Sequence, residues 1–369
     1  MPLRRVLFTA VFLGSTSLVI AHDGGVAPDS HNPASANSLA KTALPRREIE
    51  VAYPGGAPGV ELAGTLALPQ GHGPFPAVLL IQGSGPSRRD EVINGRGLFP
   101  AISDSLANQG IAVLRFDKRG NGRSTGKFDT ATTLDLAADV EAGFVFLRKR
   151  ADIRADKIGL LGHSEGGLIA PIVATRQKSV AFMVLMAAPA VSGAEIMHKQ
   201  GRLALMARGL SGARLEEAFS VQVEMINTIV SEQDSNKATP RLQDLNSRLT
   251  TLEGGPDQMI GAKLSALNSA WGRFFMSYDP RNALKRVTCP VLVLNGSADV
   301  QVDPEQNLNA IRTAFQGHRD VEIRELQGLG HAFRTVSKGA ESGSTSNEAI
   351  APIALEIIGP WIAKHVFDH

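Results

Sequence analysis

The sequence of 369 residues contains a single cysteine, Cys289, and this scarcity excludes any disulfide bond within the chain. Cys289 precedes Pro290 and a strand-like segment, where a small buried side chain is the ordinary role of the residue. The charges nearly cancel, with 38 Lys and Arg against 36 Asp and Glu, and they leave no basic footprint for a nucleic acid. We therefore expect neither a disulfide scaffold nor a nucleic-acid partner.

Metal and nucleotide signatures are also missing from the sequence. Cysteine and histidine residues do not occur at the spacings of metal sites, and no internal repeat or phosphate-binding glycine motif stands in the right context. The one His-x-Glu pair, His163 and Glu165, flanks a serine, and the motif around that serine explains the pair better than a metal site does. The sequence accordingly predicts no metal and no cofactor.

The apolar run at the N-terminus is too short for a stable membrane span but has the form of a signal peptide. Arg4 and Arg5 precede apolar residues that extend to Ile20, and a cleavage site follows at Ala21. We predict a signal peptide at 1–21, a disordered spacer at 22–45 and a globular domain at 46–369. The expected location is the periplasm or the extracellular space, with an uncleaved N-terminal anchor as the alternative.

The most informative segment is residues 158–167, in which an apolar run ends in Gly162-His-Ser-Glu-Gly166 and an apparent helix follows. In this strand–turn–helix setting, Gly-x-Ser-x-Gly is typical of a nucleophile elbow. The two glycines leave room for a tight turn that presents Ser164 to the substrate. The backbone N–H of Glu165 then points to the place where an oxyanion would form.

A serine nucleophile needs a base and a group that orients the base, and in this setting they follow it in the order acid, then histidine. A strand-like run at 291–295 leads to Asp299, and a second one at 321–326 leads to His331. We predict the triad Ser164, Asp299 and His331. Asp303 is the competing acid, although it also fits a helix cap before Pro304.

The second half of an oxyanion hole is expected after an early central strand. Residues 77–81 are such a strand, and the small residues that follow allow a backbone N–H to approach a substrate carbonyl closely. Ser84 is the first candidate donor and Gly83 the second. The charged loop at 117–124 is predicted to be a structural Asp–Arg network that braces neighbouring loops.

These segments resemble the α/β-hydrolase superfamily, in the branch of secreted bacterial carboxylesterases related to serine aminopeptidases and prolyl-oligopeptidase-type hydrolases. The stretches that carry the resemblance are 82–86, 117–124, 162–167, 296–299 and 330–331. Gln82 departs from the pattern, because many relatives carry histidine before the oxyanion glycine. The resemblance implies an α/β fold with a mostly parallel central sheet flanked by helices.

One stretch, residues 195–276, interrupts the alternation of strands and helices and has almost no strand signal. We predict a helical lid inserted within the domain. Phe274 and Phe275 at its end are candidates to line an acyl pocket, or else they hold the lid to the core.

The predicted activity is hydrolysis of carboxylic esters, with a small ester as substrate. A serine aminopeptidase or acyl-peptidase acting on short peptides is the alternative enzyme, because the same triad cleaves amides. The non-enzymatic alternative is a catalytically silent binding protein with the same fold.

Overall fold

The computed structural model describes residues 47–368, apart from residue 233 and the ranges 256–259 and 337–347. The predicted signal peptide (1–21) and spacer (22–45) lie outside the described residues. Within these limits, no helix combines the length and the apolar character needed to cross a membrane.

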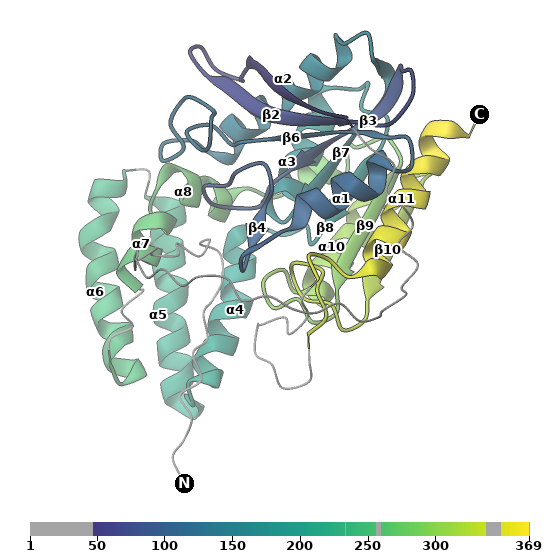
Figure 1. Ribbon diagram of the computed structural model, residues 1–369. Helices are drawn as coiled ribbons and strands as arrows, with labels where there is room; N and C mark the ends of the chain where they lie inside the picture. Colours follow the sequence, from purple (N-terminus) through teal and green to yellow (C-terminus); the bar gives the residue numbers. More distant parts are fainter. Residues whose placement is uncertain (1–46, 233, 256–259, 337–347, 369) are drawn as a thin grey trace, which may run out of the picture.

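An eight-stranded sheet lies at the centre of the molecule, with the order β1-β2-β6-β3-β7-β8-β9-β10 (Figure 1). Strands β6, β3, β7, β8, β9 and β10 run parallel, whereas β2 is antiparallel to both of its neighbours. The predicted mostly parallel sheet is confirmed. Its strands are β1 (Arg47–Pro54), β2 (Glu61–Leu68), β3 (Phe75–Ile81), β6 (Ala112–Phe116), β7 (Ile153–His163), β8 (Met183–Met186), β9 (Val291–Gly296) and β10 (Val321–Leu326).

Helices cover both faces of the sheet. The strand side chains alternate between the two faces, and because they are apolar on both, each face is buried under helices. In β3, Val78 and Leu80 belong to one apolar core, and Leu79 and Ile81 belong to the other. Strands buried on both faces give the near-continuous apolar runs seen in the sequence. The first core contains α1 (Leu98–Ala107) and α11 (Pro352–Phe367), and the second contains α2 (Thr133–Arg148), α3 (Glu165–Arg176), α9 (Arg281–Leu284) and α10 (Pro304–Ala314). A two-stranded hairpin, β4 (Val92–Ile93) and β5 (Arg96–Gly97), precedes α1.

The chain leaves the sheet after β8 and returns to it at β9. In Figure 1 the helices of this insertion stand beside the sheet, with α5, α6 and α7 farthest from it. Two small apolar clusters hold the helices together, one around Leu205 and Leu245 and the other around Ile229 and Met276. The helices of the insertion are α4 (Gly193–Ala207), α5 (Gly212–Ser231), α6 (Ser235–Glu253), α7 (Ile260–Leu267) and α8 (Ala270–Ser277), and α9, which follows them before β9, packs into a core of the sheet.

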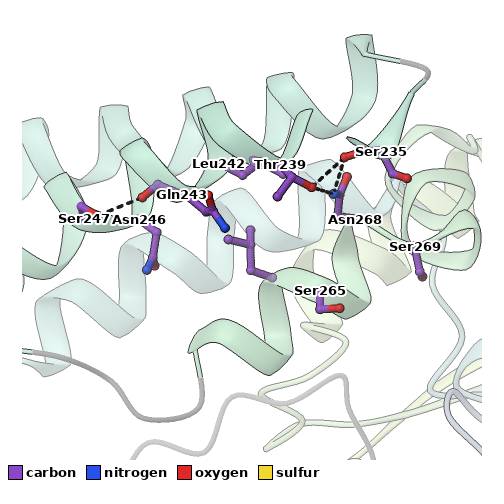
Figure 2. Close-up of a pocket in the computed structure, with 10 residues that line it drawn as sticks. Ser235, Thr239, Leu242, Gln243, Asn246, Ser247, Ser265, Asn268 and Ser269 are labelled. Atoms are coloured by element: carbon purple, nitrogen blue, oxygen red, sulfur yellow. Dashed lines mark hydrogen bonds between the residues drawn. The ribbon is translucent and has the colours of Figure 1, made fainter. Parts of the chain in front are cut away.

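A groove of about 600 Å³ lies within this insertion (Figure 2). Hydroxyl and amide side chains dominate its lining, and Asn268 Nδ2 donates hydrogen bonds to the Thr239 hydroxyl (3.2 Å) and the Ser235 carbonyl (3.0 Å). The groove is built from α6, α7 and the turn into α8. It is therefore separate from the strand ends that carry Ser164, Asp299 and His331.

Candidate active site

Ser164 lies in the sharp turn between β7 and α3, in a strained backbone conformation with φ 54° and ψ −120°. Such a conformation costs a non-glycine residue about 1–3 kcal/mol. Pairing with the next strand holds it in place, because Ser164 N–H donates to the Met186 carbonyl at 2.9 Å. The flanking glycines are required, since a Cβ on Gly162 would lie 2.1 Å from the Gly166 oxygen. The turn has the geometry predicted for a nucleophile elbow.

Asp299 and His331 come together from the loops that follow β9 and β10. Asp299 Oδ2 lies 2.9 Å from His331 Nδ1, and Asp299 Oδ1 accepts the backbone N–H groups of Gln301 (2.8 Å) and Val302 (2.9 Å). The carboxylate is thus held on one side by backbone donors and presents its other oxygen to the histidine.

Asp303, the competing acid, has a different role in the structure. It is the N-cap of α10, where its side chain accepts the N–H of Gln306 at 2.8 Å, and it pairs with Lys199 at 2.7 Å. The geometry therefore favours Asp299 as the partner of His331.

The loop of His331 packs against the nucleophile elbow. His163, which immediately precedes Ser164, donates from Nε2 to the His331 carbonyl at 3.0 Å, and the two rings lie 4.9 Å apart. Arg334 anchors the loop on its other side by donating to the carbonyls of Ala349 (3.0 Å) and Ile93 (2.8 Å). These contacts hold the loop of His331 against the residue that precedes Ser164. His331 and Ser164 are both largely shielded from solvent, with Ser164 only 5% exposed.

The predicted oxyanion hole needs one correction. Gly83 N–H donates to Glu91 Oε1 at 2.9 Å, so the expectation that Gly83 donates to a substrate is wrong. In the described part of the chain, Ser84 N–H has no acceptor, and Glu165 N–H, as the first of α3, has none within the helix. The loop does approach the nucleophile, since a Cβ on Gly83 would lie 3.1 Å from Ser164 Cβ. Ser84 and Glu165 remain the candidate donors.

Comparison with known proteins agrees with this geometry. Residues 94–335 match the family described as serine aminopeptidase, S33. The chain belongs to this family of α/β-hydrolases. Esterase EstD of Thermotoga maritima is 29% identical over 271 residues, which are 73% of this chain and 57% of EstD. The chain thus spans little more than half the length of that relative.

Solved structures show the same fold for this S33-family hydrolase. An esterase from Pyrococcus furiosus superposes with a TM-score of 0.57 at 14% identity, over 90% of this chain and 97% of its own. Est1E from Butyrivibrio proteoclasticus, solved with ferulic acid bound, gives a TM-score of 0.52 at 16% identity, over 86% and 99% of the two chains. At these identities the likeness establishes the α/β-hydrolase fold.

The two aromatic rings predicted at the end of the insertion occupy different environments in this S33-family chain. Phe275 is 1% exposed, stacks on Trp271 with ring centroids 5.3 Å apart, and packs on Gly193, where a Cβ would lie 2.4 Å from the ring. The packing favours the second role predicted for Phe275, because the ring joins α8 to α4; its place in an acyl pocket stays a prediction. Phe274 stacks on Tyr278 at 5.0 Å, and its contact with a substrate stays a prediction.

Replacing Phe275 with leucine should destabilise the protein without changing its choice of substrate. The lost ring contacts should lower the free energy of unfolding by about 1–2 kcal/mol, less than the ~3–5 kcal/mol of truncation to alanine. Urea denaturation measures the first effect, and kcat/KM for esters of rising chain length measures the second. A selective loss on long-chain esters would place Phe275 in the acyl pocket.

Three further residues at the site have partners that sequence patterns do not indicate. Trp271 Nε1 donates to Glu165 Oε1 at 2.7 Å across 106 positions of sequence, and so connects the insertion to the elbow. Glu91 reaches His163 Nδ1 at 3.1 Å across 72 positions. Lys118, from the charged loop after β6, is 2% exposed and lies 3.8 Å from Glu165 Oε2. Pairings over such distances leave no mark in a local motif.

Glu91 is a buried anion within this group. Burial favours its neutral form, but the hydrogen bond with His163, the charges of His163 and Lys118, and the bond from Gly83 N–H together hold the Glu91 pKa below its ordinary value. The carboxylate can therefore accept from both Gly83 and His163. Among the residues that the structure describes, no group of three or more His, Cys, Asp or Glu side chains is arranged to hold a metal ion.

Proposed function

We propose that this chain is a serine hydrolase that cleaves carboxylic esters through an acyl-enzyme intermediate. The observation that carries the proposal is the pairing of His331 Nδ1 with Asp299 at 2.9 Å, where the loop of His331 contacts the elbow that holds the strained Ser164. Asp299 occupies one nitrogen of the ring. The other nitrogen, Nε2, is therefore the atom that accepts the serine proton.

Ser164 and His331 act in both halves of the reaction, the acylation of the serine and the hydrolysis of the acyl-enzyme. Ser164 Oγ bonds to the ester carbonyl carbon while its proton passes to His331 Nε2. The π electrons of the carbonyl move to its oxygen, and this oxyanion accepts from the N–H groups of Ser84 and Glu165. Collapse of the intermediate breaks the bond to the alcohol oxygen, which takes the proton from His331. Water then repeats the sequence and releases the acid and free Ser164.

An ester substrate is favoured over a peptide with a free amino group. An aminopeptidase needs carboxylates to bind the substrate ammonium, and Glu195, Glu216, Glu217 and Glu224 of the insertion are candidates by position. Three of them form an ion pair with an arginine instead: Glu195 with Arg281 (2.9 Å), Glu216 with Arg202, and Glu224 with Arg241. The name of the similar EstD supports the same choice.

We also propose that the insertion is a lid over the active site and that residues 1–21 are a signal peptide for export. Trp271 connects α8 to the elbow through Glu165, which supports a role for the insertion as a lid over the site. Export to the periplasm or the extracellular space is supported by the sequence of residues 1–21.

The proposal is tested by labelling the full chain with a fluorophosphonate probe and by assaying nitrophenyl esters beside aminoacyl arylamides. We expect labelling that Ser164→Ala abolishes, together with turnover of esters above arylamides. A protein that takes up no probe and cleaves neither substrate would be a binding protein. Preference for arylamides would favour the aminopeptidase.

A further inference from the structure

Lys118 lies buried beside the loop that carries the candidate oxyanion donor Ser84. Its ammonium group donates to the Gly83 carbonyl and to the Gly85 carbonyl (3.1 Å), and it lies 3.8 Å from Glu165 Oε2. The Phe128 ring closes another side, with its centroid 5.6 Å from Nζ. A lysine is seldom placed at 2% exposure among backbone carbonyls, because desolvating its charge is costly.

We propose that Lys118 is a positioning residue of the oxyanion hole, whose ammonium group fixes the peptide between Gly83 and Ser84 and thereby aims the Ser84 N–H at the substrate oxygen. This inference rests on the proposed ester hydrolysis. It assigns to the charged loop at 117–124 a role beyond bracing its neighbours.

The geometry of the peptide group makes this coupling direct. The Gly83 carbonyl and the Ser84 N–H belong to one planar unit, and in a trans peptide they point in opposite directions. Holding the oxygen toward Lys118 therefore turns the N–H away from Lys118. A cation at the oxygen also polarises the peptide, which makes its N–H a stronger donor to a developing negative charge.

A second clamp acts on the preceding peptide of the same loop. Gly83 N–H donates to Glu91 Oε1 at 2.9 Å, and the Ser87 hydroxyl donates to Glu91 Oε2 at 3.0 Å. Glu91 and Lys118 thus hold the N–H and the carbonyl of Gly83. The peptide that presents Ser84 N–H is left little freedom to rotate.

Lys118 also connects this loop to the other half of the hole. Glu165, whose N–H is the second candidate donor, has a fully buried carboxylate that accepts from the Thr133 hydroxyl and from Trp271 Nε1, each at 2.7 Å. Its remaining oxygen faces Lys118 at 3.8 Å. One ammonium group therefore lies between the two segments that supply the two donors, and it sets their separation.

The test is Lys118→Met, which keeps the length of the side chain and removes the charge and the donors. Direct loss of one oxyanion donor lowers kcat by about 100–1000-fold, so a donor that is misaimed and less polarised should cost about 10–100-fold. We expect this loss in kcat for nitrophenyl acetate, with KM within about threefold. The affinity for an aryl trifluoromethyl ketone, which forms a tetrahedral oxyanion on Ser164, should fall by the same factor as kcat/KM.

Two comparisons keep the result interpretable. Lys149→Met removes an exposed lysine at the end of α2 and should retain wild-type kinetics. Since Lys118→Met leaves Glu165 buried without its cation, the double variant Lys118→Met/Glu165→Gln is also compared with Glu165→Gln alone. The double variant should show the same loss relative to Glu165→Gln, with circular dichroism reporting the fold.

The inference is overturned if a folded Lys118→Met or double variant keeps kcat within about twofold of its reference, because an oxyanion donor is worth much more than that. It is also overturned if kcat falls while affinity for the ketone does not, since the oxyanion hole would then be intact. Wild-type turnover and probe labelling are measured first. Their absence would reject the proposed function itself, whereas an active wild type with unaffected Lys118 variants rejects this inference alone.

Discussion

Replacing Asp299 with alanine should lower kcat for a simple ester by about 10⁴-fold, and replacing Ser164 or His331 should cost at least as much. The reason is geometric. Asp299 accepts from His331 Nδ1 at 2.9 Å, and it holds the ring in the tautomer whose Nε2 can take the serine proton. Without it, the ring can carry its proton on the wrong nitrogen. Double replacements within the triad should add little, because its members act as a unit.

Asp303→Ala is the matched control for Asp299→Ala. It removes an aspartate four positions away on the same loop, and it should retain most of the wild-type kcat. As the cap of α10, Asp303 should instead contribute about 1 kcal/mol to the free energy of unfolding. Steady-state kinetics and urea denaturation of both variants separate the two roles. If Asp303→Ala lost turnover and Asp299→Ala did not, the acid of the triad would have to be reassigned.

Replacing Arg119 with methionine should lower the free energy of unfolding by about 3–5 kcal/mol, because it leaves a buried carboxylate without its partner. Arg119 donates twice to Asp139, from Nε at 2.6 Å and from a terminal nitrogen at 2.8 Å, and Asp139 is 1% exposed. The pair ties the loop after β6 to α2. Urea denaturation followed by circular dichroism measures the loss.

An exposed ion pair provides the comparison. Arg154 lies 3.3 Å from Asp156, whose side chain is 69% exposed, and Arg154→Met should cost less than about 1 kcal/mol. The double variant Arg119→Met/Asp139→Asn should recover part of the loss, because asparagine is neutral and its oxygen can still accept the Gly56 N–H that binds Asp139 at 2.8 Å. If Arg119→Met and Arg154→Met lowered the free energy of unfolding equally, the buried pair would stabilise the protein no more than an exposed one.

The sequence by itself determined the mostly parallel sheet and the position of the nucleophile elbow. These features follow from local rules. Apolar runs buried on both faces have the pattern of parallel strands, and a turn as tight as the one at Ser164 tolerates only glycine at Gly162 and Gly166. The chain order of Ser164, Asp299 and His331 was also readable, since each follows a recognisable strand.

Only the tertiary structure decided which side chains meet at the site. Asp299 and Asp303 follow the same strand and are both candidates for the acid of the triad, and it is the loop after β10 that brings His331 to the first of them, while the second caps α10. Gly83 was expected to donate to a substrate, yet its N–H is taken by Glu91. Phe275 was expected either to line an acyl pocket or to hold the insertion to the core, and it packs against Gly193, 82 positions earlier in the chain.

Lys118 shows the limit of sequence reasoning most clearly. In the sequence it is one of several charged residues in a loop, with nothing to separate it from Arg119 or Arg123. The fold buries it against carbonyls 33 and 35 positions earlier in the chain and beside Glu165 of the elbow. Local propensity encodes where a strand ends, whereas burial and the partners of a charge depend on which distant segments pack over it.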